Sequence, residues 1–202
     1  MSGRCDGCSG KGFSIFNKGL SKMISFQPRQ VLAICSDLFG TQFDFSNVPY
    51  EERKAYADHI KKPNWSRFVP PESWLFLKPF PDVVDGIREI RKHVKFYTLS
   101  NAPWDFTYRL LNMNKIEVDG VVDLAEYRIF KPNRRAYIEA CQHIQFRPEY
   151  CLMLTANRDF GDLQGARSIG MQAQLLRGKA VRDMLELAKI FAELPVGHPV
   201  EE

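Results

Sequence analysis

The sequence lacks several features that would place it in a specialised class of protein. No apolar run approaches the roughly 18 residues that a membrane-spanning helix needs. There is no internal repeat and no long low-complexity tract, which argues against a solenoid or a disordered chain. With 202 residues, 45% of them hydrophobic, the chain is long enough for one domain with a small insertion. We therefore expect no contact with a membrane.

Outside its N-terminal extension, the chain also lacks net charge. Residues 1–30 contain five of the 28 Lys and Arg residues and one of the 24 Asp and Glu residues. The remainder carries 23 of each sign, although the whole chain has a formal net charge of +4. Because a neutral body offers no positive field to nucleic acid, we expect no nucleic-acid partner.

Cysteine is scarce and odd in number. Three of the five cysteines lie in apolar segments, which is typical of reduced core residues in an intracellular protein: Cys35, Cys141 and Cys151. No secretory signal pattern is present, so we expect a cytoplasmic protein. A mitochondrial presequence is a weaker alternative, because such segments are richer in Arg than residues 1–30 are.

The N-terminal extension, residues 1–30, contains a CxxCxGxG segment with Cys5 and Cys8. A structural zinc needs four ligands, and this pair supplies two, with no second CxxC after it. A flexible tail with two thiols, a zinc shared between two chains and a contact with a protein partner all stay open. The apolar residues that follow are at helical spacing and predict a short amphipathic helix docked on the body: Phe13, Phe16, Leu20, Met23 and Ile24.

Beyond the extension, short apolar runs alternate with amphipathic segments. The runs predict strands at 31–35, 94–100, 120–124, 151–155 and 171–176. The segments between them predict helices at 50–62, 83–93, 104–113, 134–144, 162–169 and 180–194. This alternation predicts an α/β fold with a doubly wound parallel sheet.

One connection is longer than such a sheet requires. Between the first and second strands a single helix would suffice, yet 63 positions separate Asp37 from Ser100. The surplus, residues 45–79, predicts a small cap insertion with an aromatic face. The core then comprises residues 31–44 and 80–195, and residues 196–202 form a C-terminal tail.

Polar residues follow the predicted strands in a definite order. The first strand is followed by an acid and a hydroxyl, and the second ends in a hydroxyl and an amide. A lysine precedes the helix at 134–144, and a further acid follows the fourth strand. Because ligands bind at the carboxyl ends of parallel strands, we expect four of these groups to converge in one cleft: Asp37, Ser100, Lys131 and Asp162.

In this order, the segments DLFGT, LSN, KP and GDLQGAR resemble the motifs of the haloacid dehalogenase-like hydrolase superfamily, over roughly residues 31–177. Within the superfamily, the chain most resembles the type II 2-haloacid dehalogenases. These carry an aromatic residue at the position of Phe39, where phosphatases of the superfamily carry a second Asp. The resemblance implies a Rossmann-like core, a cap over the site, and hydrolysis through an aspartate nucleophile and a covalent ester.

The resemblance also implies roles for individual residues. Asp37 would be the nucleophile, Lys131 would hold it ionised and stabilise the anionic intermediate, and Asp162 would orient the hydrolytic water. A small anionic substrate would contact Thr41, Ser100, Asn101, Phe39 and Arg67. Three further residues would support the site: Asn157, Asp159 and Tyr137.

The sequence leaves the electrophile open. Halide leaves without a proton, whereas an alkoxide profits from a general acid, which Phe39 cannot supply. This favours a 2-haloacid dehalogenase that needs no cofactor. The alternative is a phosphomonoesterase that uses Mg²⁺ on Asp37 and Asp162, because Asp159 and Asp162 give that corner two carboxylates. A third hypothesis is a non-catalytic module that binds a partner through its N-terminal tail, and a homodimer stays open in each case.

Overall fold

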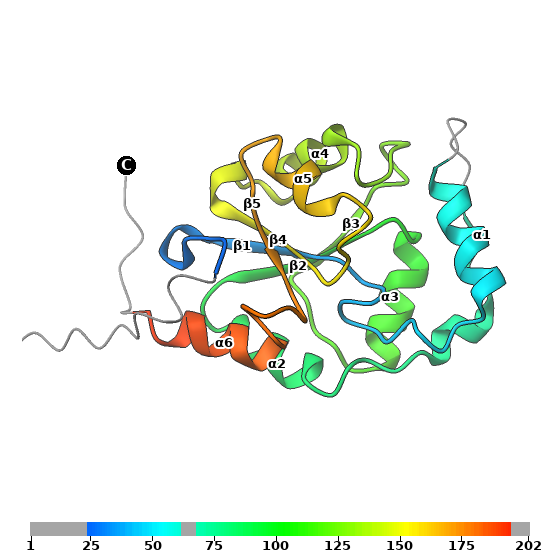
Figure 1. Ribbon diagram of the computed structural model, residues 1–202, viewed down its shortest axis with the longest axis horizontal. Helices are drawn as coiled ribbons and strands as arrows, with labels where there is room; N and C mark the ends of the chain where they lie inside the picture. Colours follow the sequence, from blue (N-terminus) through cyan, green and yellow to red (C-terminus); the bar gives the residue numbers. More distant parts are fainter. Residues whose placement is uncertain (1–23, 62–67, 195–202) are drawn as a thin grey trace, which may run out of the picture.

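The computed structural model describes residues 24–61 and 68–194. Within these ranges, five parallel strands form one sheet in the order β3-β2-β1-β4-β5 (Figure 1). The strands are β1 Ala33–Ser36, β2 Lys95–Ser100, β3 Gly120–Asp123, β4 Cys151–Thr155 and β5 Gln172–Leu175. The helices are α1 Tyr50–Ile60, α2 Val83–Ile90, α3 Trp104–Met113, α4 Arg134–Ile144, α5 Asp162–Arg167 and α6 Met184–Ala192, with short 3-10 turns at Pro28–Gln30, Glu72–Phe76 and Pro148–Tyr150.

Helices cover both faces of the sheet, which confirms the predicted doubly wound α/β fold. Figure 1 shows α4 and α5 on one face and α2 and α6 on the other. Successive residues of β1 point to opposite faces, so Ile34 packs with α2, α3 and α6, while Ala33 and Cys35 pack with α4 and α5. All four residues of β1 are buried, as expected for the central strand of a sheet with two covered faces.

Most predicted bounds agree with the structure to within three residues. The largest difference is the start of α6, at Met184 rather than residue 180. Asp183 explains it, because its side chain accepts a hydrogen bond of 2.7 Å from the backbone N–H of Glu186 and caps the helix there. The residues before the cap turn back instead, and Val181 forms a bridge with Leu176.

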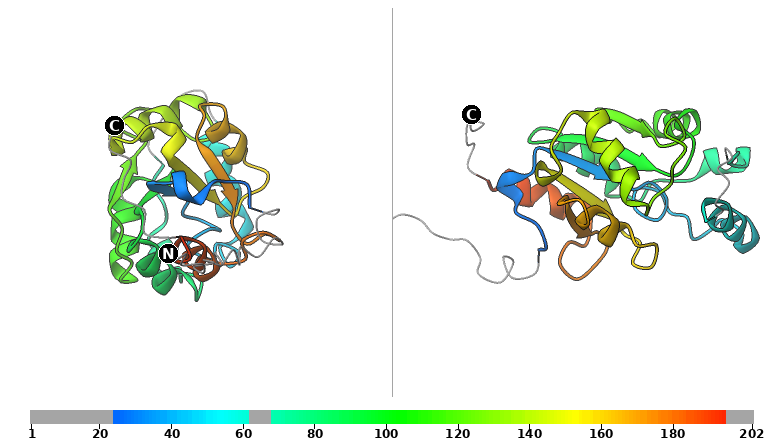
Figure 2. Two further views of the ribbon diagram at one scale, coloured as in Figure 1. Left: turned by 90° about the vertical axis from the view of Figure 1, so that its left-hand side faces the viewer. Right: turned by 90° about the horizontal axis from the view of Figure 1, so that it is seen from above.

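The described part of the predicted cap lies beyond the carboxyl ends of the strands. It contains α1 and the 3-10 turn at Glu72–Phe76 (Figures 1 and 2). Trp74 joins the insertion to the core, since it is 1% exposed and its ring lies 5.4 Å from that of Phe39. The bounds proposed for the cap at 45–79, for the core and for the tails stay predictions.

Several sequence-based expectations fall on residues that the structure leaves undescribed. They include Cys5 and Cys8, Arg67, most of the N-terminal helix and the tail at 196–202. Ile24, the last residue of that predicted helix, is described and packs partly buried against the core. No helix within 24–61 and 68–194 has the length and apolar character that crossing a membrane requires.

Candidate active site

The site forms at the point where the chain reverses the direction in which it adds strands. From β1 the chain continues to β2 on one side, and it later returns to place β4 on the other side. Asp37 directly follows β1, and its backbone N–H donates to the carbonyl of Leu154 in β4 at 2.8 Å. Asp162 begins α5, after β4. Such a switch point is where open α/β sheets form a ligand-binding crevice.

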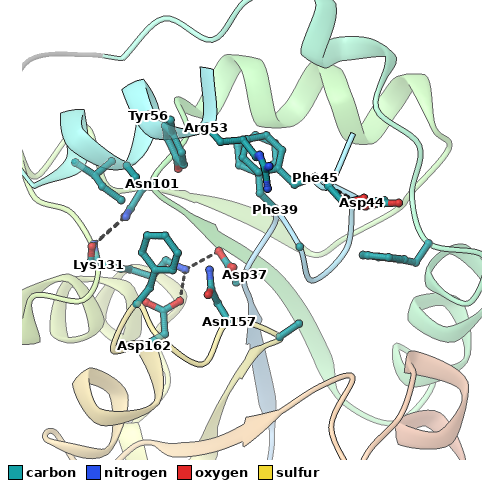
Figure 3. A pocket seen from close by; sticks show the side chains of 17 residues that line it. Asp37, Phe39, Asp44, Phe45, Arg53, Tyr56, Asn101, Lys131, Asn157 and Asp162 are labelled. Carbon is teal, nitrogen blue, oxygen red and sulfur yellow. Dashed lines mark hydrogen bonds and ion pairs between the residues drawn. The ribbon is translucent and has the colours of Figure 1, made fainter. Parts of the chain in front are cut away.

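Lys131 connects the two carboxylates. Its Nζ lies 2.7 Å from Oδ1 of Asp37 and 3.0 Å from Oδ2 of Asp162, and its side chain is 3% exposed (Figure 3). The Tyr137 hydroxyl donates to the other oxygen of Asp162, Oδ1, at 2.9 Å. The predicted convergence of acid, lysine and acid is therefore present in the structure.

Asn101 fixes the position of the lysine backbone. Its Nδ2 donates to the carbonyl of Lys131 at 3.0 Å, and its Oδ1 accepts from the N–H of Lys131 at 2.7 Å. This paired contact joins the end of β2 to the segment before α4, across 30 positions of sequence. Asn101 thus holds the lysine in place and also lines the cavity in front of it.

Burial and neighbouring charges shift the pKa values of the site. Burial and the Asp162 carboxylate raise the pKa of Asp37, against the opposing effect of the Lys131 ammonium. Burial alone would lower the pKa of Lys131, but the carboxylates of Asp162 and Asp37 outweigh it and raise that pKa. Burial and Asp162 raise the pKa of Tyr137, which keeps its hydroxyl a donor.

A cavity of about 440 Å³ opens in front of Asp37. Its floor includes Asp37, Lys131, Asp162 and Asn157, and α1 supplies much of the opposite wall (Figure 3). Aromatic rings form part of the remaining wall. Two of them, Phe39 and Phe45, stack with their ring centroids 4.5 Å apart. The cavity thus combines a charged floor with walls that are mostly apolar.

The structure separates the other predicted site residues into two groups. Phe39, Asn101 and Asn157 line the cavity. Thr41, Ser100 and Tyr137 are buried and do not line it.

The hydroxyls of this second group bind protein atoms. The Thr41 hydroxyl donates weakly to Oδ2 of Asp37, at 3.4 Å, and accepts from the N–H of Ala156 at 2.9 Å. The Ser100 hydroxyl accepts from the N–H of Ala102 at 3.1 Å and contacts Tyr56. Asp159 is exposed and lies outside the cavity lining. The roles assigned to all these residues stay predictions.

The sequence interpretation missed Arg53, which lines the cavity from α1. Its Nε is buried and has no hydrogen-bond partner among the described residues. Arg53, Tyr56, Ala57 and Ile60 all line the cavity, and their spacing of three, four and seven residues places them on one helix face. The sequence already contained that spacing, within the predicted helix at 50–62. The helix face that lines the cavity therefore carries a positive charge, which the sequence analysis had expected from Arg67.

The residues present do not fit a Mg²⁺ ion well. Within the described ranges, no three His, Cys, Asp or Glu side chains are grouped as a metal site. The Lys131 ammonium already binds one oxygen of Asp37 and one of Asp162, and the Phe39 ring beside them offers no oxygen ligand. Because Mg²⁺ takes an octahedral shell of oxygen ligands, a pair of carboxylates neutralised by an ammonium is a poor donor set.

Comparison of the sequence with protein-family models and with curated proteins gives no match. The structure, in contrast, is similar to solved dehalogenases. The L-2-haloacid dehalogenase from Xanthobacter autotrophicus has a TM-score of 0.67 at 16% identity, with 82% of this chain and 100% of that chain covered. With chloropropionic acid covalently bound, an L-2-haloacid dehalogenase from that organism has a TM-score of 0.65 at 17% identity and the same coverage.

The 2-haloacid dehalogenase from Pseudomonas syringae pv. Tomato has a TM-score of 0.58 at 14% identity, with 80% of this chain and 98% of that chain covered. The chain therefore has the haloacid dehalogenase-like fold, as its motifs predicted.

Proposed function

We propose that this chain is a hydrolase that releases halide from 2-haloacids through a covalent ester on Asp37. The observation that carries the proposal is the bridge that Lys131 forms between Asp37 and Asp162 at the floor of the cavity. The dehalogenase-like fold supports it. A dehalogenase of that fold has been solved with chloropropionic acid covalently bound, which also supports the proposal.

The first step is displacement at the carbon that carries the halogen. Lys131 holds Oδ1 of Asp37 at 2.7 Å, while the contact between Oδ2 and the Thr41 hydroxyl is longer, at 3.4 Å. Oδ2 is therefore the freer nucleophile. It forms the new C–O bond as the C–halogen bond breaks and halide leaves with the electron pair, so no proton is needed.

The second step is hydrolysis of the ester. Water attacks the Asp37 carbonyl carbon, and negative charge develops on Oδ1, next to the Lys131 ammonium that stabilises it. Asp162 takes one proton of the water, the bond between Cγ and Oδ2 of Asp37 breaks, and Asp162 returns the proton to Oδ2, which leaves as the hydroxyl oxygen of a 2-hydroxy acid. The Asp37 carboxyl group, which now holds the oxygen of the water, loses the remaining proton to solvent and is ready for the next turnover. Once Asp37 is esterified, Asp162 alone balances Lys131, so the charge of the pair is neutral before the water attacks.

Arg53 supplies the contact for the substrate carboxylate. Arg53 lines the cavity, and its buried Nε, which has no hydrogen-bond partner among the described residues, would donate to an anion once the guanidinium turned toward it. An unpaired buried donor is costly, so a bound carboxylate would recover that free energy. Arg53 thus takes the role that the sequence analysis gave to Arg67.

The phosphomonoesterase alternative has less support. Phe39 offers no proton for an alkoxide, and the carboxylates near Lys131 are a poor magnesium site. The third hypothesis, a partner-binding tail, concerns the N-terminal extension at 1–30, of which residues 1–23 lie outside the described ranges. A buried lysine between two carboxylates is costly to maintain in a fold that does not use it, which favours an enzyme over a module without catalysis.

The test is a comparison of halide and phosphate release, with Mg²⁺ and with a chelator. We expect halide from 2-chloropropionate in both conditions, and a quenched adduct that mass spectrometry maps to Asp37. Asp37→Asn, checked for deamidation, should lose the adduct and turnover, whereas Asp85→Asn on the exposed face of α2 should keep both. Metal-dependent phosphate release without halide, or undiminished turnover by Asp37→Asn, would contradict the proposal.

A further inference from the structure

The cavity in front of Asp37 is larger than a short-chain haloacid requires. Its volume of about 440 Å³ lies in the range of about 300–1,000 Å³ that pockets for drug-sized ligands have. A water molecule in the liquid takes about 30 Å³, and 2-chloropropionate is only a few heavy atoms in size. Such a substrate would leave most of the cavity to solvent.

The chemistry of the walls indicates what fills this space. Beyond the charged floor, the lining is mostly apolar, with Phe45 and Phe80 from the polypeptide around the insertion, Ala57 and Ile60 from α1, and Phe160 from the loop after β4. Phe160 is 39% exposed, so an apolar ligand would remove it from water. Flat aromatic walls favour an aromatic ligand, because ring pairs add to the free energy of burial.

The far side of the cavity also selects against a second anion. Asp44 lines it, and hydrogen bonds from the hydroxyl and N–H of Ser46, at 2.6 and 2.9 Å, lower the pKa of its carboxyl group. The ionised Asp44 would repel a dicarboxylate. Arg53 would then pair with the single carboxylate of the ligand, and the rest of the ligand would be uncharged.

We propose that the preferred substrate carries a bulky, uncharged aromatic group on the haloacid carbon chain, seated against Phe39 and Phe45 while Arg53 binds its carboxylate. This inference rests on the proposed dehalogenase function. It adds the size and polarity of the substrate, which the fold does not determine. A suitable probe is 2-chloro-3-phenylpropionate, and 2-chloropropionate is its short-chain counterpart.

The first test compares kcat/KM for halide release from the two probes. One methylene in a well-fitted apolar pocket is worth about 10-fold or more, so the phenyl substrate should exceed the short one by at least about 10-fold. A ratio at or below one would overturn the inference.

A matched pair of variants on α1 tests the location. Ala57→Phe fills the cavity, because Ala57 lines it, whereas Ala55→Phe adds the same ring to the exposed side of the helix. The preference for the phenyl substrate should fall at least about 10-fold in Ala57→Phe and stay at the wild-type value in Ala55→Phe. An equal preference in both variants would overturn the inference.

Binding without chemistry separates this inference from the proposed function. At equal concentration, 3-phenylpropionate should raise the Tm more than propionate does, and Ala57→Phe should remove the difference. If that holds but neither haloacid releases halide, the aromatic acid site stands and the dehalogenase proposal fails. If only the short haloacid reacts and 3-phenylpropionate does not raise the Tm, the dehalogenase proposal stands and this inference fails.

Discussion

The ring of Tyr137 lies so close to Gly165 that a Cβ atom at Gly165 would be 2.4 Å from Cε2 of the ring. The two residues belong to α4 and α5, which pack against each other on one face of the sheet. The same ring carries the hydroxyl that donates to Asp162 at 2.9 Å. The absence of a side chain at Gly165 therefore lets Tyr137 reach the Asp162 carboxylate.

Gly165→Ala should destabilise the protein, although alanine is the better helix former. The gain in helix propensity is about 1 kcal/mol, whereas forcing an extra methyl group into a packed contact costs about 1–3 kcal/mol. The carbonyl of Pro132 would also lie 2.7 Å from the new Cβ, so backbone as well as side chain must move. Denaturant unfolding and halide release should both show a loss.

Gly86→Ala is the matched control for this variant. A Cβ at Gly86 would lie 2.4 Å from Cβ of Met184, where α2 packs on α6, away from the cavity. It should lower stability by a similar amount and leave kcat close to wild type. A Gly165→Ala protein more stable than wild type would show that Tyr137 moves away without cost.

Lys131→Met should destabilise the protein at neutral pH, because two carboxylates would then face each other without a cation. Removing one partner of a buried ion pair costs about 3–5 kcal/mol; Asp37 is 13% exposed, so the lower end is expected. Without the ammonium, the pKa of Asp37 rises further, and protonation relieves the repulsion. The stability difference from wild type should therefore shrink as pH falls.

Lys92→Met provides the comparison for a surface ion pair. Lys92 contacts Glu89 at 2.6 Å, with side-chain exposures of 58% and 46%, and exposed pairs contribute about 0–1 kcal/mol. We expect no more than a small change in the free energy of unfolding at any pH. Equal effects of the two substitutions at neutral pH would mean that the Lys131 bridge is not formed in solution.

The acid limb of kcat/KM should lie at a higher pH than the usual Asp pKa of about 3.9. Attack needs ionised Asp37, and burial, with Asp162, raises the pKa of that group. Asp162→Asn removes the neighbouring negative charge, so the limb of its residual activity should move to lower pH. Asp85→Asn should leave the limb unchanged. A shift to higher pH in Asp162→Asn would show that Asp162 acts on Asp37 mainly through Lys131.

The sequence allowed the sheet and the charged floor of the cavity to be predicted, because both depend on short segments that occur in a fixed order. Buried parallel strands are continuous apolar runs, and Asp37 and Asp162 follow two of them that become neighbours in the sheet. The lysine was found by its place before α4, although 94 positions separate it from Asp37. Chain topology predicts the places of the two carboxylates, and the order of motifs that resembles the superfamily singles out the lysine.

The opposite wall of the cavity could not be predicted in the same way. Which face of α1 turns toward Asp37 depends on how the insertion packs, through contacts such as Phe39 with Phe45 and Trp74. The insertion packs across long sequence separations, so the sequence did not single out Arg53. Likewise, Thr41 and Ser100 were expected at the substrate because of their residue type, but their depth below the cavity floor depends on tertiary packing.

Phe39→Asp tests whether the aromatic ring makes the site unsuited to phosphate esters. A carboxyl group there could protonate an alkoxide, a contribution of about 10²–10⁴-fold when the acid is well placed. It would also add an oxygen ligand for Mg²⁺ beside Asp37. We therefore expect metal-dependent phosphomonoesterase activity to appear, and halide release to fall because the new anion repels an anionic substrate.

Stability must be measured in the same experiment, because Phe39 is 7% exposed and stacks on Phe45. Removing a buried Phe side chain typically costs about 3–5 kcal/mol. Phe39→Asn is the matched control, since it loses the same ring without gaining an acid. Phosphatase activity in Phe39→Asp but not in Phe39→Asn would assign the gain to the carboxyl group. Efficient phosphate release by the wild type, with Phe39 in place, would instead reverse the order of the two hydrolase hypotheses, because another group would then be supplying the proton.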